Sequence, residues 1–174
     1  MKGIAKGLGC EREQEARYRW RPNIMTIKRI LPPLHLLGLC IVAQVALRLL
    51  WPIAVVFPFP VNYIGLLPLA GGIVIAAKGL QALRAAKTEF HPFAQPGKLV
   101  TAGIFRRTRN PIYLGMALML LGTWVLNRCI AGVIVVPLFI LVADRWYIRS
   151  EERMLHKQFG GAFGEYKKKT RRWI

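Results

Sequence analysis

The chain has 174 residues, of which 54% are hydrophobic, and it carries 26 Lys and Arg against 8 Asp and Glu, a formal net charge of +18. The hydrophobic residues are grouped in long blocks, which is atypical of a soluble domain and typical of a membrane protein. The basic residues flank these blocks, where a membrane surface attracts them, so we expect the lipid bilayer as a partner and no nucleic acid.

The first two dozen residues differ from the rest, because "EREQEARYRWRPN" is charged and has no clear apolar face. We interpret residues 1–24 as a flexible charged extension and residues 25–174 as a single membrane domain. The three cysteines have no CxxC spacing, and the histidines have no HxxxH or HExxH spacing, so we expect neither a disulfide framework nor a metal site.

Two apolar blocks follow, at residues 34–50 and 61–83. As a helix with a rise of about 1.5 Å per residue, the first block is roughly 25 Å long, near the lower limit for crossing a bilayer. The second block contains Gly65, Gly71 and Gly72, small residues at which a neighbouring helix can approach closely.

Two further apolar blocks, residues 112–126 and 130–147, are separated by only three residues. So short a connection predicts a tight antiparallel helical hairpin. Both blocks are short, so a buried or re-entrant pair is the alternative to two full crossings. The sequence therefore predicts an all-α integral membrane protein with about four transmembrane helices.

Charge asymmetry predicts the orientation of these helices. The segment "WPIAVVFPFPVN" between the first two blocks has no charged residue, whereas residues 84–109 and the tail after Arg145 are rich in Lys and Arg. By the positive-inside rule, the central loop and both termini face the cytoplasm.

The stretch "TRNPIY" opens the third block, with Pro111 in the first helical turn and Asn110 in the position of a helix cap. A cap alone would account for Asn110, but not for the three arginines just before it. Beyond the hairpin, Glu151 and Glu152 are two of the eight acids and lie near the same cytoplasmic level as Arg109. Their simplest alternative role is surface pairing, for example of Glu152 with Arg149 or His156, which stabilises a helix by only a few tenths of a kcal/mol.

The tail "GEYKKKTRRW" is interpreted as an amphipathic or interfacial segment that contains Tyr166 and Trp173.

The stretch "LVTAGIFRRTRNPIYLG", followed by the hairpin and by "EERMLHKQFGGAFGEYKKKTRRW", resembles the isoprenylcysteine carboxyl methyltransferase and phospholipid methyltransferase superfamily of integral membrane enzymes. The resemblance covers about residues 85–173. Asn110 stands where the family most often has the histidine of an Arg-His-Pro signature. Asn-Pro at this place is similar to the bacterial branch of the family, which implies a bacterial inner membrane. The replacement concerns the identity of the acceptor, isoprenylcysteine, more than the identity of the cofactor.

The resemblance implies transfer of a methyl group from S-adenosylmethionine to a lipophilic, membrane-associated or lipidated acceptor that enters from the bilayer and presents a carboxylate, amine or hydroxyl. It places the cofactor pocket at the cytoplasmic side, between the central loop and the tail. The implied cofactor-binding residues are Leu99, Val100, Gly103, Asn110, Tyr113, Glu151 and Glu152, and the implied catalytic residues are Arg109, the cation nearest the reacting centre, and Glu152, a proton acceptor. The alternative is a small non-catalytic helical membrane scaffold, whose basic loop only sets topology.

Overall fold

The structure is a computed structural model that describes residues 32–51, 54–86 and 97–174. Its helical elements are α3 (Pro33–Leu50), η1 (Val61–Gly65), α4 (Leu66–Ala85), η2 (Gly103–Arg106), α5 (Pro111–Asn127), η3 (Ile130–Ile134), α6 (Val135–Val142), the π-helical η4 (Ala143–Ile148) and α7 (Arg149–Lys169). Within these ranges there is no strand beyond an isolated bridge between Val55 and Cys129. The extension predicted for residues 1–24 lies outside the described residues.

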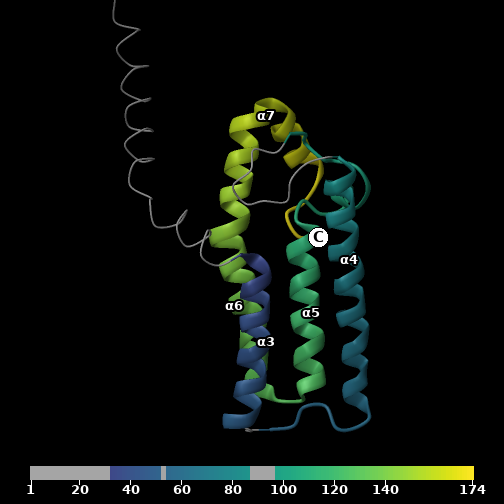
Figure 1. Cartoon of the computed structure of the whole chain (residues 1–174), viewed down its shortest axis with the longest axis vertical. Coiled ribbons are helices and arrows are strands. Elements are labelled where there is room, and N and C mark those ends of the chain that lie inside the picture. The colour runs from purple at the N-terminus through teal and green to yellow at the C-terminus, as the bar shows by residue number, and fades with distance from the viewer. Residues whose placement is uncertain (1–31, 52–53, 87–96) are drawn as a thin grey trace, which may run out of the picture. The chain divides into compact units, whose positions relative to one another are not determined.

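In the part of the chain that the structure describes, three helices are long and apolar enough to cross a membrane, namely Pro33–Leu50, Val61–Ala85 and Ile130–Lys169. The fourth apolar helix, α5, has 17 residues and is shorter. It is also the most enclosed, since nine of its 17 residues are buried and α3, α4 and α6 all contact it (Figure 1). Within the described residues the prediction of an all-helical membrane protein is confirmed, with three helices of spanning length and one shorter apolar helix where about four transmembrane helices were predicted.

Close packing of α4 against α5 depends on glycines that face each other. Gly65 lies against Gly122, and Gly72 lies against Gly115. A Cβ atom added at Gly72 would be 2.5 Å from the carbonyl oxygen of Gly115, so any side chain there would push the two backbones apart. The prediction of close approach is right for Gly65 and Gly72. It is wrong for Gly71, where an added Cβ would meet nothing within 4 Å, because adjacent helical residues point about 100° apart.

We therefore expect Gly72→Ala to destabilise the protein by about 1–3 kcal/mol, the usual cost of overpacking against atoms that cannot move aside. Gly71→Ala is the matched control, and it should be neutral or slightly stabilising because alanine favours helix more than glycine does. Melting temperatures of the two variants in the same detergent compare them. Equal melting temperatures would contradict the close approach of α4 and α5.

A buried amide attaches α3 to α5. Gln44 is fully buried, its Nε2 donates to the carbonyl of Leu120 at 3.1 Å, and its Oε1 accepts from the hydroxyl of Thr123 at 2.7 Å. Both halves of the amide are thus satisfied, as a polar group in an apolar interior requires. The bundle is closed at the end where α5 finishes by Arg128, which has a left-handed backbone and donates from Nε to the carbonyl of Phe57.

Candidate functional site

The candidate site lies at the start of α5, where three separate segments meet. The first is residues 108–110, which directly precede Pro111, the first residue of α5. The second runs from Asp144 in η4 to Glu152 in the first turn of α7. The third is the segment of residues 170–173 that follows α7, here called the strap.

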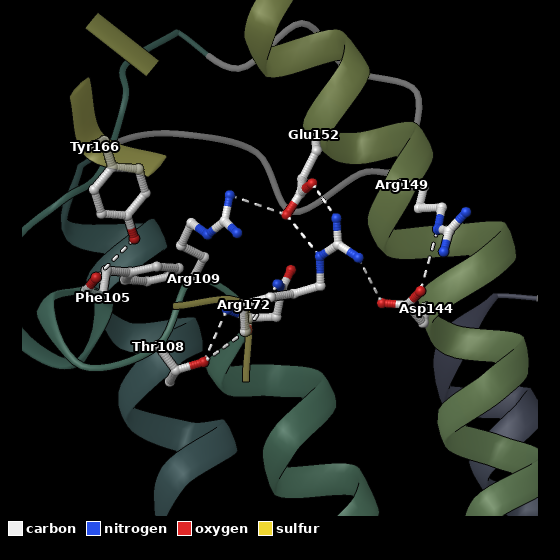
Figure 2. Close-up of polar contacts among 9 residues, drawn as sticks. Phe105, Thr108, Arg109, Asp144, Arg149, Glu152, Tyr166 and Arg172 are labelled. Atoms are coloured by element: carbon white, nitrogen blue, oxygen red, sulfur yellow. Dashed lines mark hydrogen bonds and ion pairs between the residues drawn. The ribbon is translucent and has the colours of Figure 1, made fainter. Parts of the chain in front are cut away.

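A break in α7 returns the chain towards the site. Gly160 has φ 48° and ψ −119°, a conformation that residues with a side chain rarely adopt, and the helical axis changes direction there. Beyond the break, Phe163 and Tyr166 pack against Phe105, and the Tyr166 hydroxyl donates to the Phe105 carbonyl at 2.7 Å (Figure 2). Tyr166 is therefore buried while Lys167, Lys168 and Lys169 after it are exposed, which fits the amphipathic alternative predicted for the tail.

The strap is hydrogen-bonded to the residues that precede α5. The backbone N–H of Arg109 donates to the carbonyl of Arg171 at 3.0 Å. The carbonyl of Arg172 accepts from both the Thr108 hydroxyl, at 3.1 Å, and the Asn110 Nδ2, at 3.0 Å. These contacts join segments that are about sixty residues apart in sequence.

Asn110 occupies the N-cap position, but its side chain makes no capping hydrogen bond. Its amide instead donates to the strap, and the residue is only 8% exposed. The interpretation of Asn110 as a side-chain helix cap is therefore wrong, although Pro111 does begin the helix as expected. The acceptor of this amide, the carbonyl of Arg172, lies 62 residues away in the sequence, so no local pattern could indicate the contact.

Glu152 lies at the centre of an ion network. Arg172 donates to both of its carboxylate oxygens, from Nε to Oε1 at 3.0 Å and from Nη2 to Oε2 at 2.7 Å. Arg109 Nη1 lies 3.2 Å from the same Oε1. Figure 2 shows both guanidinium groups directed at this carboxylate. The alternative of surface pairing is wrong for Glu152, since Arg149 pairs instead with Asp144 at 3.2 Å.

Asp144 extends the network, because its Oδ1 accepts from Arg172 Nη1 at 2.9 Å. Hydrogen bonding to Glu152 raises the pKa of Arg172, with smaller contributions from the charges of Glu152 and Asp144, while burial lowers it. The net shift is upward, so Arg172 remains a cation at every physiological pH. Two carboxylates and one guanidinium thereby fix η4, α7 and the strap against one another.

Arg109 is held differently from Arg172. Its side chain is only 9% exposed, yet neither its Nε nor its Nη1 has a hydrogen-bond partner among the described residues. The contact with Glu152 is thus an ion pair by distance, without an aligned N–H. Folded proteins leave few buried donors unpaired, and an acceptor that satisfies them, such as an anionic ligand group, would relieve the cost.

Glu151 faces a different partner from its neighbour. Its Oε1 accepts from the hydroxyl of Tyr113 at 2.6 Å, and Tyr113 is 2% exposed. The ring of Tyr147 lies beside that of Tyr113, with centroids 6.1 Å apart. Adjacent helical residues point about 100° apart, so Glu151 contacts α5 whereas Glu152 contacts the strap and Arg109.

The sequence-predicted residues thus fall into two groups. Arg109, Asn110, Tyr113, Glu151 and Glu152 lie around the start of α5 and connect to one another through hydrogen bonds, ion pairs or adjacency in the chain. Leu99 and Val100 pack instead against the adjoining aromatic cluster of Phe105, Phe163 and Tyr166, while Gly103 begins η2 with φ 62°.

Three residues of the site were missed by the sequence reasoning: Thr108, Asp144 and Arg172. Asp144 gave a usable signal, because an acid within an apolar block is rare and usually functional. It also lies in a π-helical turn, a feature often found at functional sites. Arg172 gave no signal, since it is one of several cations in "KKKTRRW".

Comparison with known proteins identifies the family. A family model described as phospholipid methyltransferase matches residues 61–162. The chain belongs to the phospholipid methyltransferase family. The match extends from η1 into α7 and includes Arg109 and Glu152, whereas the strap lies beyond it.

One curated relative is similar to part of the chain. It is an uncharacterized protein of Haemophilus influenzae, 41% identical over 66 residues, which are 36% of this chain and 100% of the relative. No solved structure matches the chain. Family membership and the apolar helices together make this protein a membrane methyltransferase in general terms, as the sequence resemblance implied.

Proposed function

We propose that the protein transfers a methyl group from S-adenosylmethionine to a lipophilic acceptor that reaches the site from the bilayer. The family's methyltransferases generally use this cofactor. The observation that carries the proposal is that two buried donor atoms of Arg109, Nε and Nη1, make no hydrogen bond among the described residues, although Nη1 lies 3.2 Å from the carboxylate of Glu152. A ligand with both an anionic and a cationic group suits such a site.

The donor set fits the cofactor's amino-acid end, which has a carboxylate and an ammonium group. The open N–H groups of Arg109 suit the carboxylate, and the oxygens of Glu151 and Glu152 suit the ammonium or the ribose hydroxyls. The other residues proposed to bind the cofactor are Asn110 and Tyr113 at the start of α5 and, as an apolar and backbone wall, Leu99, Val100 and Gly103.

When bound, the cofactor supplies a methyl group attached to a cationic sulfur. The protein's contribution is to align the acceptor and exclude water, with Arg109 as the cation nearest the reacting centre. A carboxylate acceptor needs no base. An amine or hydroxyl acceptor must lose a proton, and we assign that role to Glu152, whose Oε2 accepts one hydrogen bond, from Arg172, and keeps a lone pair.

We further propose that all four apolar helices cross the membrane, that α5 and the following helix form a hairpin, and that the site and both termini are cytoplasmic, in a bacterial inner membrane. Charge supports this orientation. Arg106, Arg107 and Arg109 precede the start of α5, whereas residues 54–60, which lie near the other end of α5, have no charge.

Calorimetric titration of the detergent-purified protein with S-adenosylmethionine and S-adenosylhomocysteine tests the proposal. We expect both to bind to the unmodified protein and to Arg107→Gln, which changes an exposed arginine beside the site. Arg109→Gln should bind neither at comparable concentration. Absence of binding by the unmodified protein would overturn the proposal and favour the membrane scaffold.

A further inference from the structure

Arg172 joins all three segments of the site by itself. Its guanidinium binds Glu152 of α7 through two nitrogens and Asp144 of η4 through the third. Its backbone carbonyl accepts from Thr108 and Asn110, in the segment before α5. Arg172 itself belongs to the strap, so these hydrogen bonds connect the strap to both of the other segments. The family match ends at residue 162, so it does not include Arg172.

Arg109 and Arg172 compete for the same carboxylate. A guanidinium binds a carboxylate best as a fork, with two parallel N–H groups on the two oxygens. Arg172 has that arrangement with Glu152, at 3.0 and 2.7 Å. Arg109 approaches only Oε1, at 3.2 Å, and its Nε and Nη1 stay without a hydrogen bond although the side chain is 9% exposed.

We propose that Arg172 is a positioning residue for the cofactor site. By occupying Glu152 as a fork, it keeps the N–H groups of Arg109 open for an anionic ligand group, which we identify as the carboxylate of the cofactor. This identification rests on the proposed function. Without Arg172, the guanidinium of Arg109 turns to form the fork with Glu152, and the ligand's carboxylate loses its donors.

Two ligands that differ by one carboxylate test this role directly. The unmodified protein should bind S-adenosylmethionine about tenfold or more tightly than its decarboxylated form, as expected for charge-assisted hydrogen bonds. Arg172→Gln should bring that ratio close to one, while its affinity for the decarboxylated ligand changes by less than about threefold. The measurement is calorimetric titration, with no turnover required.

Two further variants sharpen the comparison. Arg171→Gln changes an exposed side chain in the same strap and should keep the ratio of the unmodified protein. Arg172→Lys keeps the charge but has no planar fork, so its ratio should be intermediate. This variant also serves as the second probe if Arg172→Gln does not fold, as judged by its melting curve.

The outcomes separate the two proposals. If the unmodified protein binds neither ligand, the proposed function fails and this inference fails with it. If the unmodified protein discriminates between the ligands and Arg172→Gln discriminates equally well, only the positioning role is overturned. An equal loss of affinity for both ligands in Arg172→Gln would also overturn it, because the strap would then shape the pocket without directing Arg109.

Discussion

We expect Glu152→Gln to weaken binding of S-adenosylmethionine by about tenfold or more, the effect of losing one charge-assisted hydrogen bond in a site with little water. The neutral amide cannot form ion pairs with Arg109 and Arg172, and it has only one oxygen where the carboxylate has two. Arg109 would then be a buried cation without a partner. Since Arg172 is 28% exposed and can be solvated, we expect a loss of stability of about 2–3 kcal/mol, below the full cost of breaking a buried pair.

Glu165 provides the control for this experiment, and Glu151 provides a comparison within the site. Glu165→Gln removes an exposed pair with Lys168 and should change stability by under about half a kcal/mol, with binding unchanged. Glu151→Gln should be harmful but less so than Glu152→Gln, because the amide oxygen still accepts from the Tyr113 hydroxyl. Melting curves establish folding before calorimetric titration. Binding by Glu152→Gln at the affinity of the unmodified protein would remove Glu152 from the site.

The helices could be predicted because their determinants are local. Each apolar block became a helix, and the bounds differ little from those expected, as for α5, observed at Pro111–Asn127. The helix that begins at Ile130 instead continues well beyond the apolar block, to Lys169. Its polar half is held by the ion network and by the aromatic cluster around Phe163, which hydrophobic patterning does not reveal.

The part of the site that the sequence did not reveal depends on the return of the chain after α7. The dipeptide Gly160-Gly161 is a local signal for a break in the helix, but it does not indicate where the chain goes after the break. The strap then meets residues about sixty positions earlier. Asn110 therefore looked like a cap, and the partner of the Tyr166 hydroxyl could not be predicted, because in each case the partner is distant in sequence.

The residues taken from the family resemblance were brought together more completely than those judged from local patterns. Arg109 and Glu152 are 43 residues apart in the sequence, yet they form an ion pair at 3.2 Å. Resemblance to a family indicates which residues far apart in the sequence come together in the fold, whereas helix propensity and hydrophobic periodicity do not. It could not supply Arg172, because that residue is indistinguishable in sequence from its basic neighbours.

The second large effect is expected for Asn110→Asp, which should weaken cofactor binding by about tenfold and destabilise the protein by about 2 kcal/mol or more. Asp and Asn cap helices about equally well, so a cap would survive the change. Aspartate has no Nδ2, so the hydrogen bond to the carbonyl of Arg172 would be lost. A carboxylate would face the carbonyl oxygen of Arg172 at the 3.0 Å now bridged by an N–H, and two acceptors at that distance repel.

Displacing that carbonyl moves Arg172 as a whole, and with it the fork on Glu152, so the loss should appear in both melting temperature and cofactor titration. Asn110→Ser tests the same point differently, because serine caps well but is too short to reach the strap. Thr108→Ser is the matched control, since it keeps the hydroxyl that donates to the same carbonyl. If Asn110→Asp and Asn110→Ser both melt and bind as the unmodified protein does, the contact with the strap contributes nothing, and Asn110 acts only as a polar residue at the start of α5.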